Sequence, residues 1–176
     1  MRPRVVAGVG GGHGSPAVLR RAAAEARLRG AELWAVLAWD APGAGAGGRH
    51  LTGPAPSLSV FREDAAERLR RSLGAAFGAA GAGVPLTGRA VRGTPGAALV
   101  DIADDQDCVI VVGTGSRGAA HRLLWPSVAR YCLAHAPCPV LAVPPSPLRA
   151  GLAAVHRRNV LRLRLDTREL TDRDGV

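Results

Sequence analysis

The chain has 176 residues, of which 47% are hydrophobic and only 3% aromatic, and its formal net charge is +9. This length suits one domain with a sizeable core, which must be built mainly from Val, Leu and Ala. No apolar run approaches the length of about 18 residues that a membrane span needs, and the first residues lack the hydrophobic region of a signal peptide. The composition therefore argues against a membrane protein and against a secreted one.

The charge is carried by arginine alone, because the sequence contains no lysine. Arginine is spread along the chain rather than gathered in one run. A basic chain can bind nucleic acid through phosphate contacts, but the aromatic platforms that accompany single-strand binding are scarce here. We favour solvated surface charge and keep an arginine-driven nucleic-acid binder as a weaker alternative.

The cysteines, Cys108, Cys132 and Cys138, form no CxxC pair and are odd in number. That usage indicates a reducing compartment, so we expect a cytoplasmic protein. Each cysteine is expected to be a small, buried core residue.

Short apolar runs alternate with helical patterns from one end of the chain to the other. We expect strands at Arg4–Val9, Glu32–Trp39, Pro85–Val91, Cys108–Val112 and Pro139–Val143. We expect helices over about Pro16–Arg29, Leu58–Ala80, Gly96–Ala103 and Ser127–His135. Ser-Pro and Thr-Pro pairs supply an N-cap and a first-turn proline to two of these helices. The alternation predicts an open α/β fold, a five-stranded parallel sheet with helices on both faces.

The two longest helical patterns each have a recognisable apolar face. In the first, the face consists of Val18, Leu19, Ala22, Ala23 and Ala26. In the second, the residues roughly in phase are Val60, Ala65, Leu69, Leu73 and Phe77. Both faces are predicted to pack on the sheet.

Glycine-rich turns follow the first and fourth strands, at Gly10–Gly14 and Gly113–Gly118. Ligands of parallel sheets bind beyond the carboxyl ends of the strands, and a glycine-rich loop followed by a helix start can present N–H groups to a phosphate. Residues 1–147 are expected to form this domain. Residues 148–176 carry seven arginines and four acidic residues, and we expect a basic tail of weak or partial order.

Four segments, in this order, resemble the universal stress protein family: RVVAGVG, SPAVLRRAAAEARLRGAELWAVLAW, AVRGTPGAALVDIADDQDCVIVVG and PSVARYCLAHAPCPVLAVP. They cover about residues 4–144. The resemblance implies an adenine nucleotide α-hydrolase-like fold with strand order 3-2-1-4-5, and dimers joined along the fifth strand. It also implies that many members bind ATP through Gly, two residues, Gly, nine residues, Gly, then Ser or Thr.

The ATP pattern is incomplete in this sequence. Without gaps it maps to Gly113, Ser116, Pro126 and Ser127, so the second and third glycines are lost. Proline has no N–H to donate to a phosphate, and Ser116 carries a Cβ where glycine allows close backbone approach. The resemblance also implies an aspartate at the end of the first strand, where this chain has Gly10.

Other positions of the implied site are kept or ambiguous. Ala38 corresponds to an apolar residue that contacts adenine. A gapped match would pair Gly115 and Gly118 with the first two glycines, but it shortens the following spacer, and we prefer the ungapped match. The candidate ATP-site positions are Gly10, Ala38, Gly113, Gly115, Ser116, Gly118, Ser127 and Val128.

Each candidate also has a structural interpretation. The glycines of the loop can simply supply positive φ for a tight turn, which we favour over phosphate binding. Ser127 can satisfy the first-turn N–H groups of its helix. Trp39 can stack on a base, although covering the end of the core is the commoner role. We expect solvated surface positions for His13, Arg117 and Arg122.

No catalytic constellation and no metal-ligand spacing emerges, so we predict a protein that is not an enzyme and holds no metal. The leading hypothesis is a stress-response or regulatory module, with weak ATP binding or none. The alternative is an ATP-binding stress sensor that uses Gly113–Gly118 and Ser127.

A homodimer is expected through Pro139–Val143, because this apolar run would form a sheet edge with unpaired backbone groups. The protein partner is not identified by the sequence.

Overall fold

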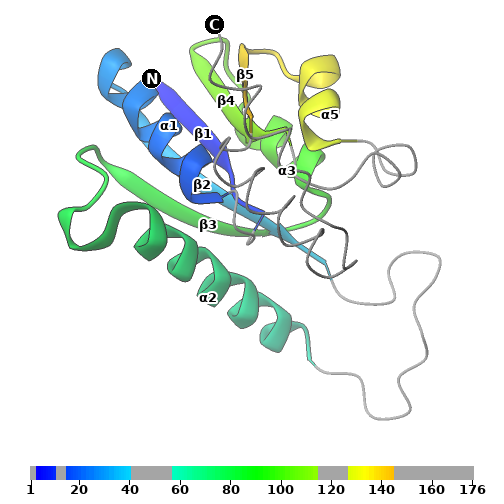
Figure 1. Ribbon diagram of the computed structural model, residues 1–176. Coiled ribbons are helices and arrows are strands. Elements are labelled where there is room, and N and C mark those ends of the chain that lie inside the picture. Colours follow the sequence, from blue (N-terminus) through cyan, green and yellow to red (C-terminus); the bar gives the residue numbers. More distant parts are fainter. Residues whose placement is uncertain (1–2, 11–14, 41–56, 115–126, 145–176) are drawn as a thin grey trace, which may run out of the picture. The chain divides into compact units, whose positions relative to one another are not determined.

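Five parallel strands form one sheet in the order β3-β2-β1-β4-β5 (Figure 1). The strands are β1 (Arg4–Gly8), β2 (Glu32–Trp39), β3 (Leu86–Arg92), β4 (Cys108–Gly113) and β5 (Val140–Val143). The computed structural model describes residues 3–10, 15–40, 57–114 and 127–144. The predicted strands, their parallel direction and their order are confirmed.

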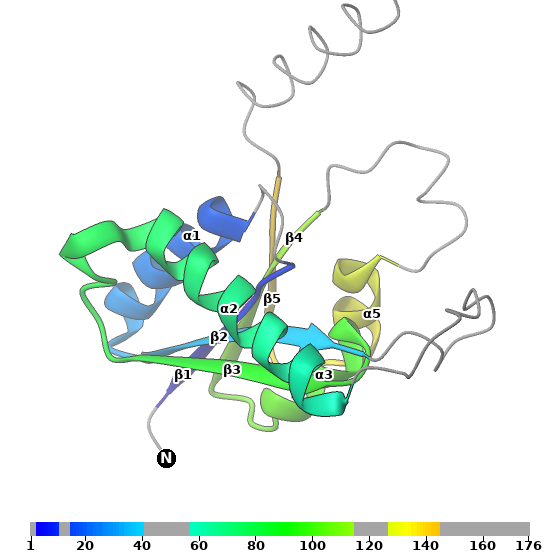
Figure 2. The same ribbon diagram turned by 90° about the horizontal axis from the view of Figure 1, so that it is seen from below.

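Helices cover both faces of the sheet (Figure 2). One face packs against α1 (Ser15–Arg29) and α2 (Leu58–Phe77), which the short 3₁₀ turn η1 (Gly78–Ala80) follows. The other face packs against α3 (Pro95–Ile102) and α5 (Val128–His135). Because both faces are covered, the central strands are apolar at nearly every position rather than at alternate ones. Val5, Val6 and Ala7 of β1 are all fully buried.

The predicted face of α1 is confirmed, since all its apolar residues are buried. The prediction for α2 is wrong at Val60, which is 51% exposed. The buried residues of α2 are Ala65, Leu69, Ser72 and Ala76. Val60 precedes Ala65 by five residues, which turns it about 140° away from that stripe. Phe61, four residues before Ala65, packs against the core instead.

The helices α3 and α5 approach each other closely at Gly96. A Cβ at this position would lie 2.5 Å from Cδ1 and 2.7 Å from Cγ of Tyr131 on α5. The tyrosine ring stacks on His135 with ring centroids 4.2 Å apart. Glycine at 96 is therefore required by packing.

On the same face, the ring of Trp34 on β2 is flanked by arginines from both neighbouring strands. The guanidinium carbons of Arg4 on β1 and Arg89 on β3 each lie 4.8 Å from the ring centroid. Arg4 is also paired with Asp104 at 3.1 Å, and the indole Nε1 donates to Glu32 at 3.4 Å. These side chains cover the face of the sheet around Trp34.

Within the described residues, no helix is long and apolar enough to cross a membrane.

Candidate functional site

The candidate site lies at the carboxyl edge of the sheet, beside β1 and β4. The chain adds β2 and β3 on one side of β1 and then β4 and β5 on the other. Strand order therefore reverses between β1 and β4, and ligands of open α/β sheets bind at such a reversal. Because all strands are parallel, Gly10, Ala38 and Gly113 are brought to this one edge.

At the end of β1 the backbone is fixed but the side-chain position is open. Val9 is buried, and its N–H donates to the carbonyl of Val36 at 2.8 Å. The next residue, Gly10, is exposed, and no atom of the described residues lies within 4 Å of the place where its Cβ would be. Among the described residues there is thus room for a larger side chain at this position.

The end of β2 presents two residues to opposite faces of the sheet. Ala38 is half-buried and lies in register with Val91 of β3. Trp39 is 8% exposed and belongs to the core under α1 and α2, as expected for a residue that covers the end of the core. Its Nε1 is buried and has no hydrogen-bond partner among the residues that the structure describes.

The end of β4 is tied to β5 by a residue that sequence reasoning missed. Gly113 lies in register with Val143. The backbone N–H of Thr114 donates to the carbonyl of Val143 at 3.0 Å, and its hydroxyl reaches the same oxygen at 3.5 Å. The position of Thr114 directly after a buried strand is the feature of the sequence that could have indicated this role. Thr114 thus holds the end of β4 against the end of β5.

The amino end of α5 is capped by Ser127. Its backbone is extended (φ −67°, ψ 138°), and its Oγ accepts a hydrogen bond from the N–H of Arg130 at 3.1 Å. The structural interpretation of Ser127 as an N-cap is therefore confirmed. Its hydroxyl hydrogen points to no partner in the described part of the chain, and with the N–H of Val128 it can still donate to an anion.

The remaining sequence candidates lie outside the described residues, and their predictions stay untested. They are His13, Gly115, Ser116, Arg117, Gly118, Arg122 and Pro126. Within the described ranges, no three His, Cys, Asp or Glu side chains gather into a group that could hold a metal ion.

A separate hollow of about 270 Å³ lies at the opposite edge, where α1 ends and β2 and β3 begin. Its lining consists of Ala26, Arg27, Gly30, Ala31, Glu32, Gly83, Val84 and Pro85. Arg27 is already engaged there, because its Nη1 donates to the carbonyl of Ala82 at 2.9 Å. The hollow belongs to the packing of this corner and not to the carboxyl-edge site.

The strand order, the helices on both faces and the site at the β1–β4 reversal define an adenine nucleotide α-hydrolase-like fold. The model of the universal stress protein family matches residues 1–144. The chain belongs to the universal stress protein family.

Solved structures agree with this assignment. A universal stress protein from Archaeoglobus fulgidus is 28% identical with a TM-score of 0.57, covering 81% of this chain and 98% of that one. The Archaeoglobus fulgidus protein in complex with dAMP is 26% identical, with a TM-score of 0.54 and coverage of 81% and 97%. A universal stress protein in complex with cAMP shares the fold, at 23% identity and a TM-score of 0.62, over 82% and 99% of the two chains. Among curated proteins, none matches this sequence.

Proposed function

We propose that this chain is a dimeric regulatory module of its family, without catalytic activity, and that it binds ATP weakly or not at all. The observation that carries the proposal is Gly10. It stands at the end of β1, where the resemblance implies a nucleotide-binding aspartate, and the described residues leave open space beside it. We further propose that the module works in the reducing cytoplasm, which its three free cysteines support.

Three changes weaken the implied nucleotide site. Gly10 removes a carboxylate, Pro126 removes a backbone donor, and Ser116 adds a side chain in the phosphate loop. Losing a charged contact or a donor typically costs about 1–3 kcal/mol. Because about 1.4 kcal/mol corresponds to a factor of ten in the dissociation constant, the changes together weaken ATP binding by a few orders of magnitude.

A second candidate function is an adenine-nucleotide sensor. It is supported by the amino end of α5, where the Ser127 hydroxyl and the N–H of Val128 remain suited to an anion. A relative of 26% identity is described in complex with dAMP, a nucleotide with one phosphate. A ligand of low charge would depend less on the three altered positions than ATP does.

The decisive experiment restores the missing groups. We expect the triple variant Gly10→Asp, Ser116→Gly, Pro126→Gly to bind ATP roughly 10- to 1000-fold more tightly than the wild type in calorimetric titration. A matched control is Gly74→Asp, which makes the same charge change at another open position, near the end of α2. If the control gains as much affinity as the triple variant, the proposed mapping of the site is wrong.

The dimer is proposed through the outer edge of β5. This strand ends the sheet, and the carbonyls of Pro139 and Val143 accept from Ile110 and Thr114 on the β4 side. Backbone groups of successive strand residues point to opposite sides, so those of Val140 and Ala142 point away from the sheet. An antiparallel copy of β5 would satisfy them, and a two-fold pair is the commonest closed assembly.

A further inference from the structure

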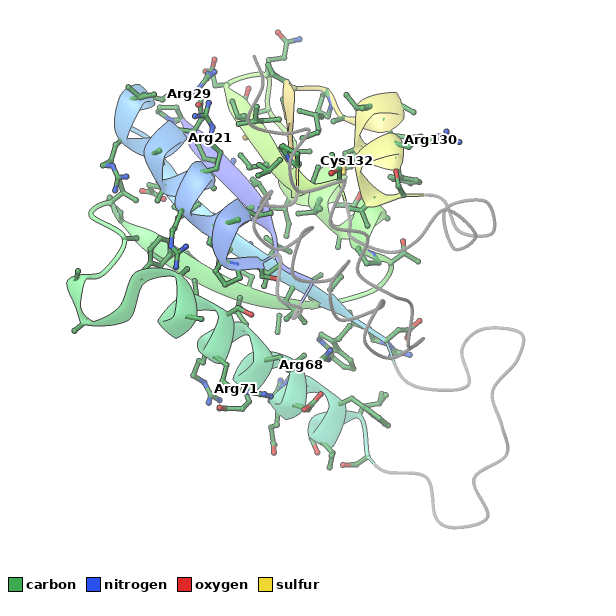
Figure 3. All side chains as sticks on the ribbon, viewed as in Figure 1. Arg21, Arg29, Arg68, Arg71, Arg130 and Cys132 are labelled. Carbon is green, nitrogen blue, oxygen red and sulfur yellow. The ribbon has the colours of Figure 1, made fainter. Side chains whose placement is uncertain are left out.

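Three cysteines meet on the α3/α5 face of the sheet, where Cys108 joins Cys132 and Cys138 from a more distant part of the sequence. Cys108 begins β4, Cys132 lies on α5 and Cys138 stands two residues before β5. All three are free, and they are 2%, 0% and 9% exposed in that order. They belong to one apolar cluster, and Figure 3 shows Cys132 on the side of α5 that faces the strands.

The strand register brings two of the thiols level with each other. Ile110 of β4 lies opposite Val140 of β5, and its N–H donates to the carbonyl of Pro139 at 3.0 Å. Cys108 and Cys138 each lie two residues before this pair, and both belong to the apolar cluster that contains Ile110 and against which Val140 packs. The spacing of neighbouring strands, about 4.8 Å, falls in the range of Cα separations of about 4.4–6.8 Å that a disulfide needs. The pairing of Ile110 with Val140 thus places the segment that leads into β5, and holds Cys138, beside the start of β4.

The third thiol approaches from the helix. Burial raises the pKa of the Cys132 thiol, and the adjacent Cys138 raises it further. Burial likewise raises the pKa of Cys138, with Cys108 as the next contributor. Cys138 lies in the same apolar cluster as the other two thiols and interacts with each of them, and it is the most exposed of the three.

We propose that Cys138 is an oxidation site for hydroperoxides and closes an intramolecular disulfide with Cys108 or Cys132. The Cys138 sulfur attacks one peroxide oxygen, so that an S–O bond forms, the O–O bond breaks, and water or an alcohol leaves. The neighbouring sulfur then attacks the sulfenic acid, forming the S–S bond and releasing water as the S–O bond breaks. Two thiols lose two electrons in total, and the peroxide gains them.

The environment sets the character of this reaction. The thiolate is the nucleophile, and the raised pKa values of Cys132 and Cys138 favour the protonated thiol. Oxidation is therefore slower than that of a small free thiol. The disulfide ties the segment before the edge strand β5 to β4 or to α5. Closing a loop in the chain stabilises the folded state, so oxidation is expected to raise Tm.

The test uses the full chain, reduced and then treated with hydrogen peroxide, with remaining thiols blocked before digestion after arginine. Arg117, Arg122 and Arg130 separate Cys108 from the other two cysteines, and no arginine lies between Cys132 and Cys138. A Cys108 disulfide therefore joins two peptides, whereas a Cys132–Cys138 disulfide stays within one. Single variants Cys108→Ala, Cys132→Ala and Cys138→Ala identify the participants, each first shown to unfold cooperatively when reduced.

We expect Cys138→Ala to lose the intramolecular disulfide and the rise in Tm on oxidation. Cys108→Ala or Cys132→Ala keeps both, because Cys138 retains one neighbour. Three results would overturn the proposal: a disulfide that persists in Cys138→Ala, a bond between two copies on a non-reducing gel, or oxidation that ends at sulfenic or sulfinic acid.

Discussion

The interior of this protein and the carboxyl edge of its sheet differ in how closely their residues match what each region requires. The interior keeps what an open α/β fold requires, with apolar residues along β1, β2 and β4 and apolar faces on the helices. At the carboxyl edge the structure describes the strand ends and the start of α5, and Gly10 stands where the family resemblance implies an aspartate. A core needs volume and apolarity, which many residues supply, whereas a phosphate site needs particular atoms. On the function proposed above, the fold is retained while the chemistry of the site differs.

The largest expected effect on stability comes from replacing glycine by alanine, and its size should differ between the interior and the carboxyl edge. We expect Gly96→Ala to destabilise the protein by about 1–3 kcal/mol, because the new Cβ overlaps the root of the Tyr131 side chain. Gly10→Ala has open space and should change the free energy of unfolding by less than about 0.5 kcal/mol. Urea unfolding followed by circular dichroism measures both.

A helical control completes this comparison. Gly74 lies inside α2 with open space around it, so Gly74→Ala should stabilise the protein by about 0.5–1 kcal/mol. If Gly96→Ala and Gly74→Ala change the free energy of unfolding equally, then α3 and α5 do not pack tightly at Gly96.

The next largest effect is expected at β5. One side of this strand pairs with β4, and the other side is proposed to pair with a second copy of the chain. Ala142→Pro removes an outward-pointing N–H and leaves the hydrogen bonds to β4 in place. With one lost donor per copy, we expect a dimer weaker by about 1–3 kcal/mol, roughly tenfold to a hundredfold. Ala142→Val keeps the N–H and is the matched control. Light scattering over a dilution series gives the result; a dimer that Ala142→Pro leaves unchanged must use another surface.

Alkaline pH probes the interior through its buried thiols. Their pKa values are raised in the fold, first by burial and then by a neighbouring thiol, so the folded protein holds these protons more tightly than the unfolded chain. Their contribution to stability is complete below the unfolded pKa and is lost as pH rises through the folded pKa. Since the chain has no lysine and one tyrosine, few other groups titrate there.

The measurement is the free energy of unfolding in reducing buffer at about pH 7.5 and about pH 10. We expect a decline for the wild type and a smaller decline for Cys138→Ala. Equal declines in the two proteins would assign the alkaline loss to another group.

The smallest effect tests the arginines around Trp34. Arg89→Ala removes one of the two guanidinium groups beside the ring and should cost about 0.5–1 kcal/mol. Arg62→Ala, at an exposed position of α2, removes the same charge elsewhere and serves as the control. If both variants lose the same stability, the effect is one of net charge and not of the aromatic contact.

Much of the fold could be predicted because its signals are local. Uninterrupted apolar runs such as Cys108–Val112 mark strands buried on both faces, and Thr-Pro marks the start of α3. The strand order required the family resemblance, since periodicity does not say which strands are neighbours. The exposure of Val60 depends on the angular position of a helix against the sheet, which a rough phase does not fix.

The site was less predictable because it depends on distances between segments. Ser127 as a cap followed from its place before a helix, whereas the link from Thr114 to Val143 depends on how β4 and β5 end together. The meeting of three cysteines likewise follows from strand register and helix packing, not from their spacing in the sequence.

The most direct test of the central claim is calorimetric titration of the purified wild-type protein with ATP in the presence of magnesium. The altered positions predict no measurable heat of binding, or a dissociation constant weaker than about 100 μM. The protein must first show cooperative unfolding, so that a negative result reflects the site and not a misfolded sample. Binding at micromolar concentration or tighter would contradict the account and establish an ATP site built without Asp at position 10.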